Sequence, residues 1–117
     1  MEINSTIETL SALAQPTRLE AFRTLVRHEP QGLAAGALAE TLRVPANTLS
    51  AHLGILARAG LITSQREGRS IVYRAELERL RAVISFLLKD CCQGRPEICA
   101  PLLTELDSCC TTAGASR

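Results

Sequence analysis

The sequence predicts a mainly α-helical domain with a small β-hairpin, arranged as a winged helix-turn-helix. First, Val44–Gly60 has the period of an amphipathic helix, because Leu49, Leu53 and Leu56 recur at spacings of four and three. Second, a shorter helical run, Ala35–Leu42, lies just before it across a tight turn. Third, two β-prone runs follow around a glycine-containing turn. The alternative is an ordinary helical hairpin inside a small all-α domain.

Length and composition narrow the class of protein. The 117 residues suffice for one domain, and with 46% hydrophobic but only 3% aromatic residues the core must be aliphatic. No apolar run approaches 18 residues, and the first ten residues lack the features of a signal peptide. We therefore expect a cytoplasmic protein with no membrane partner, whose thiols stay reduced.

Two helices are expected before the helix-turn-helix. Residues 3–14 repeat apolar side chains at four and three, which gives a narrow stripe made of Ile3, Ile7, Leu10 and Ala14. Pro16 ends that helix and suits the first turn of the next one, where its missing N–H is not needed. Thr17–His28 then has a core face made of Leu19, Phe22, Leu25 and Val26.

The face of Val44–Gly60 that lies away from the leucines carries short side chains. Asn, Thr and Ser can bond to base edges without holding the helix away from a groove, so this helix suits DNA recognition. The candidates for DNA contact on it are Asn47, Thr48, Ser50, Ala51, His52 and Arg58. As a possible metal ligand, His52 is less well explained than as a packing or hydrogen-bonding residue.

The two β-prone runs, Leu61–Gln65 and Ser70–Arg74, flank a turn that contains Gly68 and form a hairpin. The net charge of the chain is only +1, but the segment after the recognition helix is locally basic. Arg66 and Arg69 at the hairpin tip are candidates for contacts to phosphates or the minor groove; the alternative is a solvated turn.

A long helix is expected at Ala75–Asp90, with one apolar face formed by Leu77, Leu80, Ile84, Leu87 and Leu88. We interpret this helix and the one at residues 3–14 as the interface of a homodimer, which would make operator recognition symmetric. The alternative is that both helices pack on the core of their own chain.

Three segments resemble the ArsR/SmtB family of dimeric winged-helix repressors. They are ALAQPTRLEAFRTL (Ala12–Leu25), LSAHLGILARAGLI (Leu49–Ile62) and REGRSIVY (Arg66–Tyr73). Pro45 stands where many members have a polar helix cap, and Ala51 where many have a basic residue. The recognition helix therefore lacks one expected contact to phosphate or base. We expect Arg58 and the hairpin arginines to supply more of the DNA binding instead.

The known metal sites of the family are absent from their usual segments. The helix at Ala35–Leu42 has no cysteine pair, and His28 and His52 are the only histidines, which disfavours a zinc site on the last helix. We therefore expect two parts: a winged helix-turn-helix domain for DNA binding and dimerisation, residues 1–90, and a cysteine-rich metalloid-sensing segment and tail, residues 91–117.

Five cysteines lie in that last segment. Cys91, Cys92 and Cys99 resemble the C-terminal arsenite site of one branch of the family, and a turn at Gly94 and Pro96 can bring the three thiols together. Three thiolates without nitrogen or oxygen partners suit As(III), whereas Zn²⁺ prefers a fourth ligand. A possible second pair, Cys109 and Cys110, could bind another ion, scavenge metal or have no role.

The expected function is repression of an arsenic-resistance operon, with release from operator DNA when As(III) binds. The inducer could be arsenite, methylarsenite or antimonite, and no organic cofactor is expected. One alternative is a repressor that senses thiol oxidation; another is a cytosolic protein that binds and buffers metalloids. An enzyme is not expected, since no catalytic arrangement of Ser, His, Asp, metal ligands or phosphate-binding loop occurs.

Overall fold

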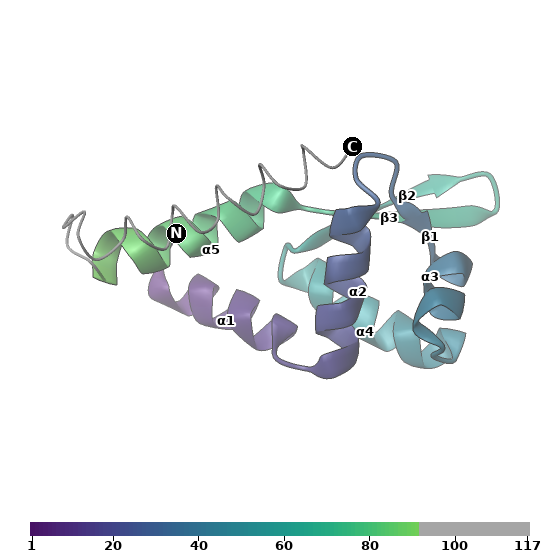
Figure 1. The fold of residues 1–117 in the computed structure, drawn as a ribbon, viewed down its shortest axis with the longest axis horizontal. Helices are drawn as coiled ribbons and strands as arrows, with labels where there is room; N and C mark the ends of the chain where they lie inside the picture. The colour runs from purple at the N-terminus through teal and green to yellow at the C-terminus, as the bar shows by residue number, and fades with distance from the viewer. Residues whose placement is uncertain (92–117) are drawn as a thin grey trace, which may run out of the picture. The chain divides into compact units, whose positions relative to one another are not determined.

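The computed structural model describes residues 1–91 and shows a winged helix-turn-helix (Figure 1). In chain order the elements are α1 Ile3–Leu13, α2 Pro16–Arg27, β1 Leu33–Ala34, α3 Ala35–Leu42, α4 Ala46–Arg58, β2 Ile62–Glu67, β3 Ser70–Ala75 and α5 Leu77–Cys91. Contacts divide the chain into two compact units, and the boundary between Val83 and Ile84 falls within α5. The predicted fold class, a mainly α-helical winged helix-turn-helix, is confirmed.

The helix-turn-helix consists of α3 and α4, joined by a short turn. Arg43 ends α3 in the left-handed conformation, with φ 58° and ψ 47°, and its N–H bonds to the carbonyls of Ala39 and Glu40. Pro45 precedes α4 and provides no side-chain cap, as the sequence predicts. The reversal at Arg43 turns the chain so that both helices face the same core.

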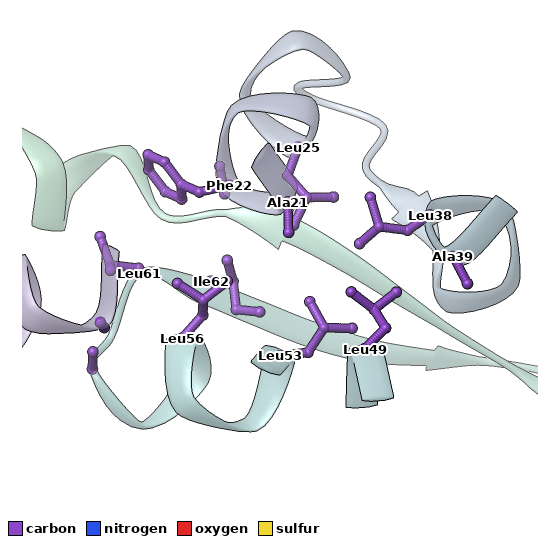
Figure 2. Close-up of a cluster of buried hydrophobic side chains, with 13 residues drawn as sticks. Ala21, Phe22, Leu25, Leu38, Ala39, Leu49, Leu53, Leu56, Leu61 and Ile62 are labelled. Atoms are coloured by element: carbon purple, nitrogen blue, oxygen red, sulfur yellow. The ribbon is translucent and has the colours of Figure 1, made fainter. Parts of the chain in front are cut away.

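That core is built around the three leucines of α4 (Figure 2). Leu49, Leu53 and Leu56 are at most 1% exposed and point toward α2 and α3, which confirms the predicted core face of the recognition helix. The buried residues of the same cluster are aliphatic apart from one phenylalanine; they include Ala21, Phe22, Leu25, Leu38, Ala39, Leu61 and Ile62. The aliphatic core expected from the composition is therefore present.

Helix α1 packs on α2 and α4 with the face opposite to its apolar stripe. Thr6, Thr9 and Ala12 are at most 4% exposed, and the two threonine hydroxyls donate to helix carbonyls four residues earlier. Ile3 and Ile7 of the predicted stripe are 62% and 58% exposed within the chain. Short side chains let α1 approach its neighbours closely, and the larger apolar residues face away.

A third strand, β1, joins the predicted hairpin. The sheet is antiparallel with the order β1-β3-β2, and Leu33 and Ala34 pair with Tyr73 and Val72. Gly32 makes this approach possible: its φ is +79°, and a Cβ there would lie 2.5 Å from the Tyr73 carbonyl oxygen. Strand β1 was not predicted from the sequence, because a strand of two residues has no visible period.

Helix α5 begins two residues later than predicted and ends one residue later. Ala75 belongs to β3, because it pairs with Ile62 at the open end of the hairpin. Val83 is buried and Leu80 packs against the core. Within residues 1–91, none of the helices combines the length and the apolar character that crossing a membrane requires.

Candidate nucleic-acid interface

The outward face of α4 lies opposite the buried leucines and carries only small or polar side chains up to its last turn. Asn47, Ala51, Gly54 and Arg58 follow at spacings of four, three and four, so they form one row along the helix. Four of the predicted DNA contacts are exposed in the first half of α4: Asn47, Thr48, Ser50 and Ala51. No bulky side chain in this part prevents the backbone of α4 from approaching a partner closely.

Arg58 lies at the other end of that row. It is about 16 Å from Asn47 along the helix axis, at 1.5 Å per residue. Its guanidinium lies beside Gly54, and it lines a groove between α1 and α4 together with Ile7 and Arg18. A cation in the last turn also interacts favourably with the helix dipole. The structure therefore separates Arg58 from the contacts at the N-terminal half of α4.

His52 is half-buried and differs from its exposed neighbours on α4. Its Nδ1 lies 3.3 Å from Nη1 of Arg18, in the first turn of α2. The Nε of Arg18 donates to the carbonyl oxygen of Ala12 at 2.6 Å. His52 thus forms a hydrogen bond within the chain, as expected of a histidine that is not a metal ligand.

Arg18 of α2 is a further residue of this region, not predicted from the sequence. Its position in the sequence could have pointed to a special role. The N-terminal end of a helix disfavours positive charge, and Arg18 is the third residue of α2. A cation at that position needs partners from outside its own helix. It finds them in the Ala12 carbonyl group and the His52 imidazole.

The wing consists of β2 and β3, with a turn in which Gly68 has φ +64°. Arg66 pairs across the hairpin with Ile71, and Arg69 lies in the turn; both side chains are exposed. Among residues 1–91, neither arginine forms an ion pair with a carboxylate. Their charges are therefore available to an anionic partner.

Arg74, the other arginine of the wing, is already neutralised. Its Nη2 lies 2.8 Å from Oε1 of Glu29, in the turn after α2. The hydrogen bond from Arg74 lowers the pKa of Glu29, and the same bond raises the pKa of Arg74. The basic charge of the wing is thereby concentrated at Arg66 and Arg69.

Comparison with known proteins identifies the family. A family model described as a helix-turn-helix domain matches residues 13–65. The transcriptional activator HlyU of Vibrio cholerae is 32% identical over 96 residues, which are 80% of this chain and 86% of HlyU. The transcriptional repressor SmtB of Mycobacterium tuberculosis is 36% identical over 77 residues, 66% of this chain and 55% of SmtB.

The fold agrees with these relatives. The solved structure of an ArsR-like transcriptional regulator from Rhodococcus sp. RHA1 matches with a TM-score of 0.66 and 27% identity, and covers 94% of this chain and 93% of that protein. The chain belongs to the ArsR/SmtB family. It is a DNA-binding regulator of transcription, and the relatives named here are regulators, not enzymes.

In this ArsR/SmtB-family regulator, the predicted thiol site lies at and beyond the end of the described chain. Cys91 is the last residue of α5. Cys92, Cys99, Cys109 and Cys110 lie outside the described residues. Between residues 1 and 91, no group of three or more His, Cys, Asp or Glu side chains is gathered in a way that could hold a metal ion.

Proposed function

We propose that this chain is a cytoplasmic, homodimeric repressor that binds operator DNA through α4 and the wing. Release from DNA follows when As(III), as arsenite or a related trivalent species, binds Cys91, Cys92 and Cys99. The observation that carries the DNA-binding part is the exposed surface of α4 away from its buried leucine stripe, which presents the short side chains of Asn47, Thr48, Ser50 and Ala51.

The exposed polar residues of α4 support insertion of this helix into the major groove. Asn47, Thr48 and Ser50 offer hydrogen bonds to base edges, and Ala51 adds only a methyl group. Arg66 and Arg69 supply positive charge at the tip of the wing, where neighbouring phosphates of the same duplex would lie. Base contacts and phosphate contacts thus come from two different elements.

The exposed stripe of α1 supports the homodimer. Ile3, Ile7 and Leu10 are between 40% and 62% exposed, although they form a continuous apolar row at helical spacing. A second copy of the chain would cover this row and present two recognition helices to successive major grooves. A DNA site with two related half-sites is the expected partner of such a dimer.

The donor set supports As(III) as the inducer. Three thiolates bind a soft trivalent centre in a pyramid and leave its lone pair on the fourth side, so no further ligand is required. Adjacent cysteines form a poor disulfide because their Cα atoms are only about 3.8 Å apart, and they stay available for chelation. A tenfold loss of operator affinity on binding requires a coupling of only about 1.4 kcal/mol.

The test of the inducer compares the reduced wild-type chain with Cys92→Ser and Cys109→Ser. We expect all three to bind a duplex from upstream of the coding region equally well, measured by fluorescence anisotropy. Arsenite should release the wild type and Cys109→Ser but not Cys92→Ser.

Each other outcome of this test contradicts the proposal. Normal release of Cys92→Ser by arsenite would show that the site is elsewhere. Release by a thiol oxidant, with arsenite inactive, would indicate the redox-sensing alternative. Arsenite binding by native mass spectrometry without any DNA binding would indicate the buffering alternative.

The test of the DNA interface is the salt dependence of binding. If each protomer neutralises about four phosphates, the slope of log K against log salt is about −7, and Arg69→Ala flattens it by about 2 because both wings change. Arg23→Ala is the matched control, since Arg23 is an exposed arginine on α2 that pairs with Glu20. An unchanged slope in Arg69→Ala would remove the wing from the interface.

A further inference from the structure

Arg18 connects three helices of the domain. Its backbone N–H donates to the side chain of Gln15 at the start of α2, at 2.8 Å. Its Nε donates to the carbonyl oxygen of Ala12 in the last turn of α1, and its Nη1 contacts Nδ1 of His52 on α4. The side chain is half-buried, so these contacts hold it in one place.

The contact with Arg18 also defines the tautomer of His52. A guanidinium has only donors, so Nδ1 of His52 must be the acceptor of the 3.3 Å hydrogen bond. An imidazole that accepts at Nδ1 and is neutral carries its proton on Nε2. Arg18 therefore leaves His52 with a single polar hydrogen, at the nitrogen that points away from the guanidinium.

His52 lies on the flank of α4. At about 100° per residue, it falls between the buried leucines and the outward row that contains Asn47 and Ala51. When a helix lies in the major groove, its outward row meets the bases and its flank meets the sugar–phosphate backbone. A neutral Nε2–H donor on that flank fits a phosphate oxygen.

We propose that Arg18 is a positioning residue for DNA binding: it holds His52 in the Nε2–H tautomer, so that the imidazole donates to a DNA phosphate. This inference rests on the proposed function, because it assumes that α4 reads the major groove. Arg18 itself contacts no phosphate and acts only through His52. Since it also holds the Ala12 carbonyl, it fixes α4 relative to the end of α1.

The first experiment observes the tautomer in the free, full-length chain. Two-bond ¹H–¹⁵N correlation spectra distinguish the two neutral tautomers of each imidazole, and His28 serves as the internal control. We expect His52 of the wild type to show the Nε2–H pattern and to become a mixture in Arg18→Gln. A His52 pattern that is the same in both proteins would overturn the proposal.

The second experiment measures affinity and salt slope for the duplex from upstream of the coding region. Arg18→Gln should weaken binding about tenfold while the salt slope stays unchanged. His52→Gln, whose amide places an N–H near the position of Nε2, should stay within about twofold of the wild type, and His52→Leu should lose about tenfold. A slope that flattens by about 2 in Arg18→Gln would instead make Arg18 a phosphate contact.

A third variant, Arg18→Lys, guards against a folding defect. The spectra of the free protein separate the role of Arg18 from the proposed DNA-binding function. Arg18→Lys keeps the charge and a donor but cannot span both acceptors, so it should lie between the wild type and Arg18→Gln; wild-type binding by Arg18→Lys would overturn the proposal. Absence of DNA binding by the wild type would overturn the proposed function and the phosphate contact together. The tautomer spectra still decide whether Arg18 controls His52.

Discussion

Helices α1 and α4 carry nearly the same apolar pattern and use it in opposite ways. In α4, Leu49, Leu53 and Leu56 are at most 1% exposed and form the centre of the core. In α1, Ile3 and Ile7 are 62% and 58% exposed, and the helix packs on its own chain through buried threonine and alanine and the partly buried Leu13 instead. Hydrophobic period thus identifies a helix and a face, but it does not identify the partner of that face.

The difference follows from the size of the side chains on the opposite faces. The outward row of α4 offers no large apolar side chain, so α4 packs on the core through the opposite face, which carries its leucines. The face of α1 opposite the stripe contains Thr6, Thr9 and Ala12, which are small enough to lie close to α2 and α4. Because that face is used inside the chain, the larger apolar stripe of α1 stays available to a second molecule.

The largest expected effect tests the α4 side of the comparison. Leu53→Ala should lower the free energy of unfolding by about 3 kcal/mol, because it removes buried atoms and leaves a cavity. Urea denaturation followed by circular dichroism measures this change. A loss below about 1 kcal/mol would mean that the leucine stripe of α4 is not the centre of the core.

The next effect tests the α1 side. Ile7→Ala should weaken the homodimer on the order of 30-fold, since two copies of the side chain leave the interface, yet it should change the stability of the monomer little. Sedimentation equilibrium over a range of protein concentrations measures dimerisation. If the oligomeric state stays unchanged and stability falls as in Leu53→Ala, the two stripes have the same role and the comparison fails.

A smaller effect is expected on the buried face of α1. Thr9 is 1% exposed, and its hydroxyl bonds within the helix. Thr9→Leu should cost about 2 kcal/mol by overpacking, whereas Thr9→Val, which keeps the volume, should stay within about 1 kcal/mol of the wild type. Thermal unfolding of both variants at equal concentration measures the difference. Equal stability of the two variants would contradict close packing of α1.

The smallest expected change in stability comes from an ion pair outside both apolar stripes, and it serves as a baseline for the effects above. Glu29→Gln removes the ion pair with Arg74 and should lower Tm at pH 7 by about 3 °C. Because the folded-state pKa of Glu29 is lowered, its contribution is complete above the unfolded-state pKa and disappears as pH falls from about 5 through the lowered value. Scanning calorimetry across pH measures this.

The matched control for that baseline is Glu20→Gln. Glu20 forms an exposed ion pair with Arg23 at 3.7 Å, and its removal should change Tm less than the removal of Glu29 does. A Tm difference between Glu29→Gln and the wild type that persists unchanged at low pH would show that the effect of the substitution is not electrostatic.

Sequence alone predicted the elements whose stabilising contacts follow a local period. The leucine stripe of α4, the helix α3 and the hairpin around Gly68 all lie where the pattern places them. Strand β1 was missed because two residues carry no period and its pairing with Tyr73 is distant in sequence. Local patterns therefore sufficed for the fold class but not for the complete sheet.

For the candidate site too, the sequence predicted the features that follow a local period but not the contacts between distant residues. The exposure of Asn47, Thr48 and Ser50 follows from their place on α4 away from the leucine stripe. Two hydrogen bonds do not follow from any local pattern. Arg18 and His52 are 34 residues apart in the sequence, and Arg74 and Glu29 are 45 residues apart. Both change which charges and donors the surface offers, and only the folded chain brings their members together.

Strand β1 has a mechanical consequence for regulation. It is followed directly by α3 and is hydrogen-bonded to β3, so the first helix of the DNA-reading pair and the wing share one piece of sheet. If the proposed inducer rotates α3, the pairing of β1 with β3 transmits the movement to the wing. Derepression would then move both sets of DNA contacts in one concerted step, and a footprint would vanish as a whole instead of shrinking from one end.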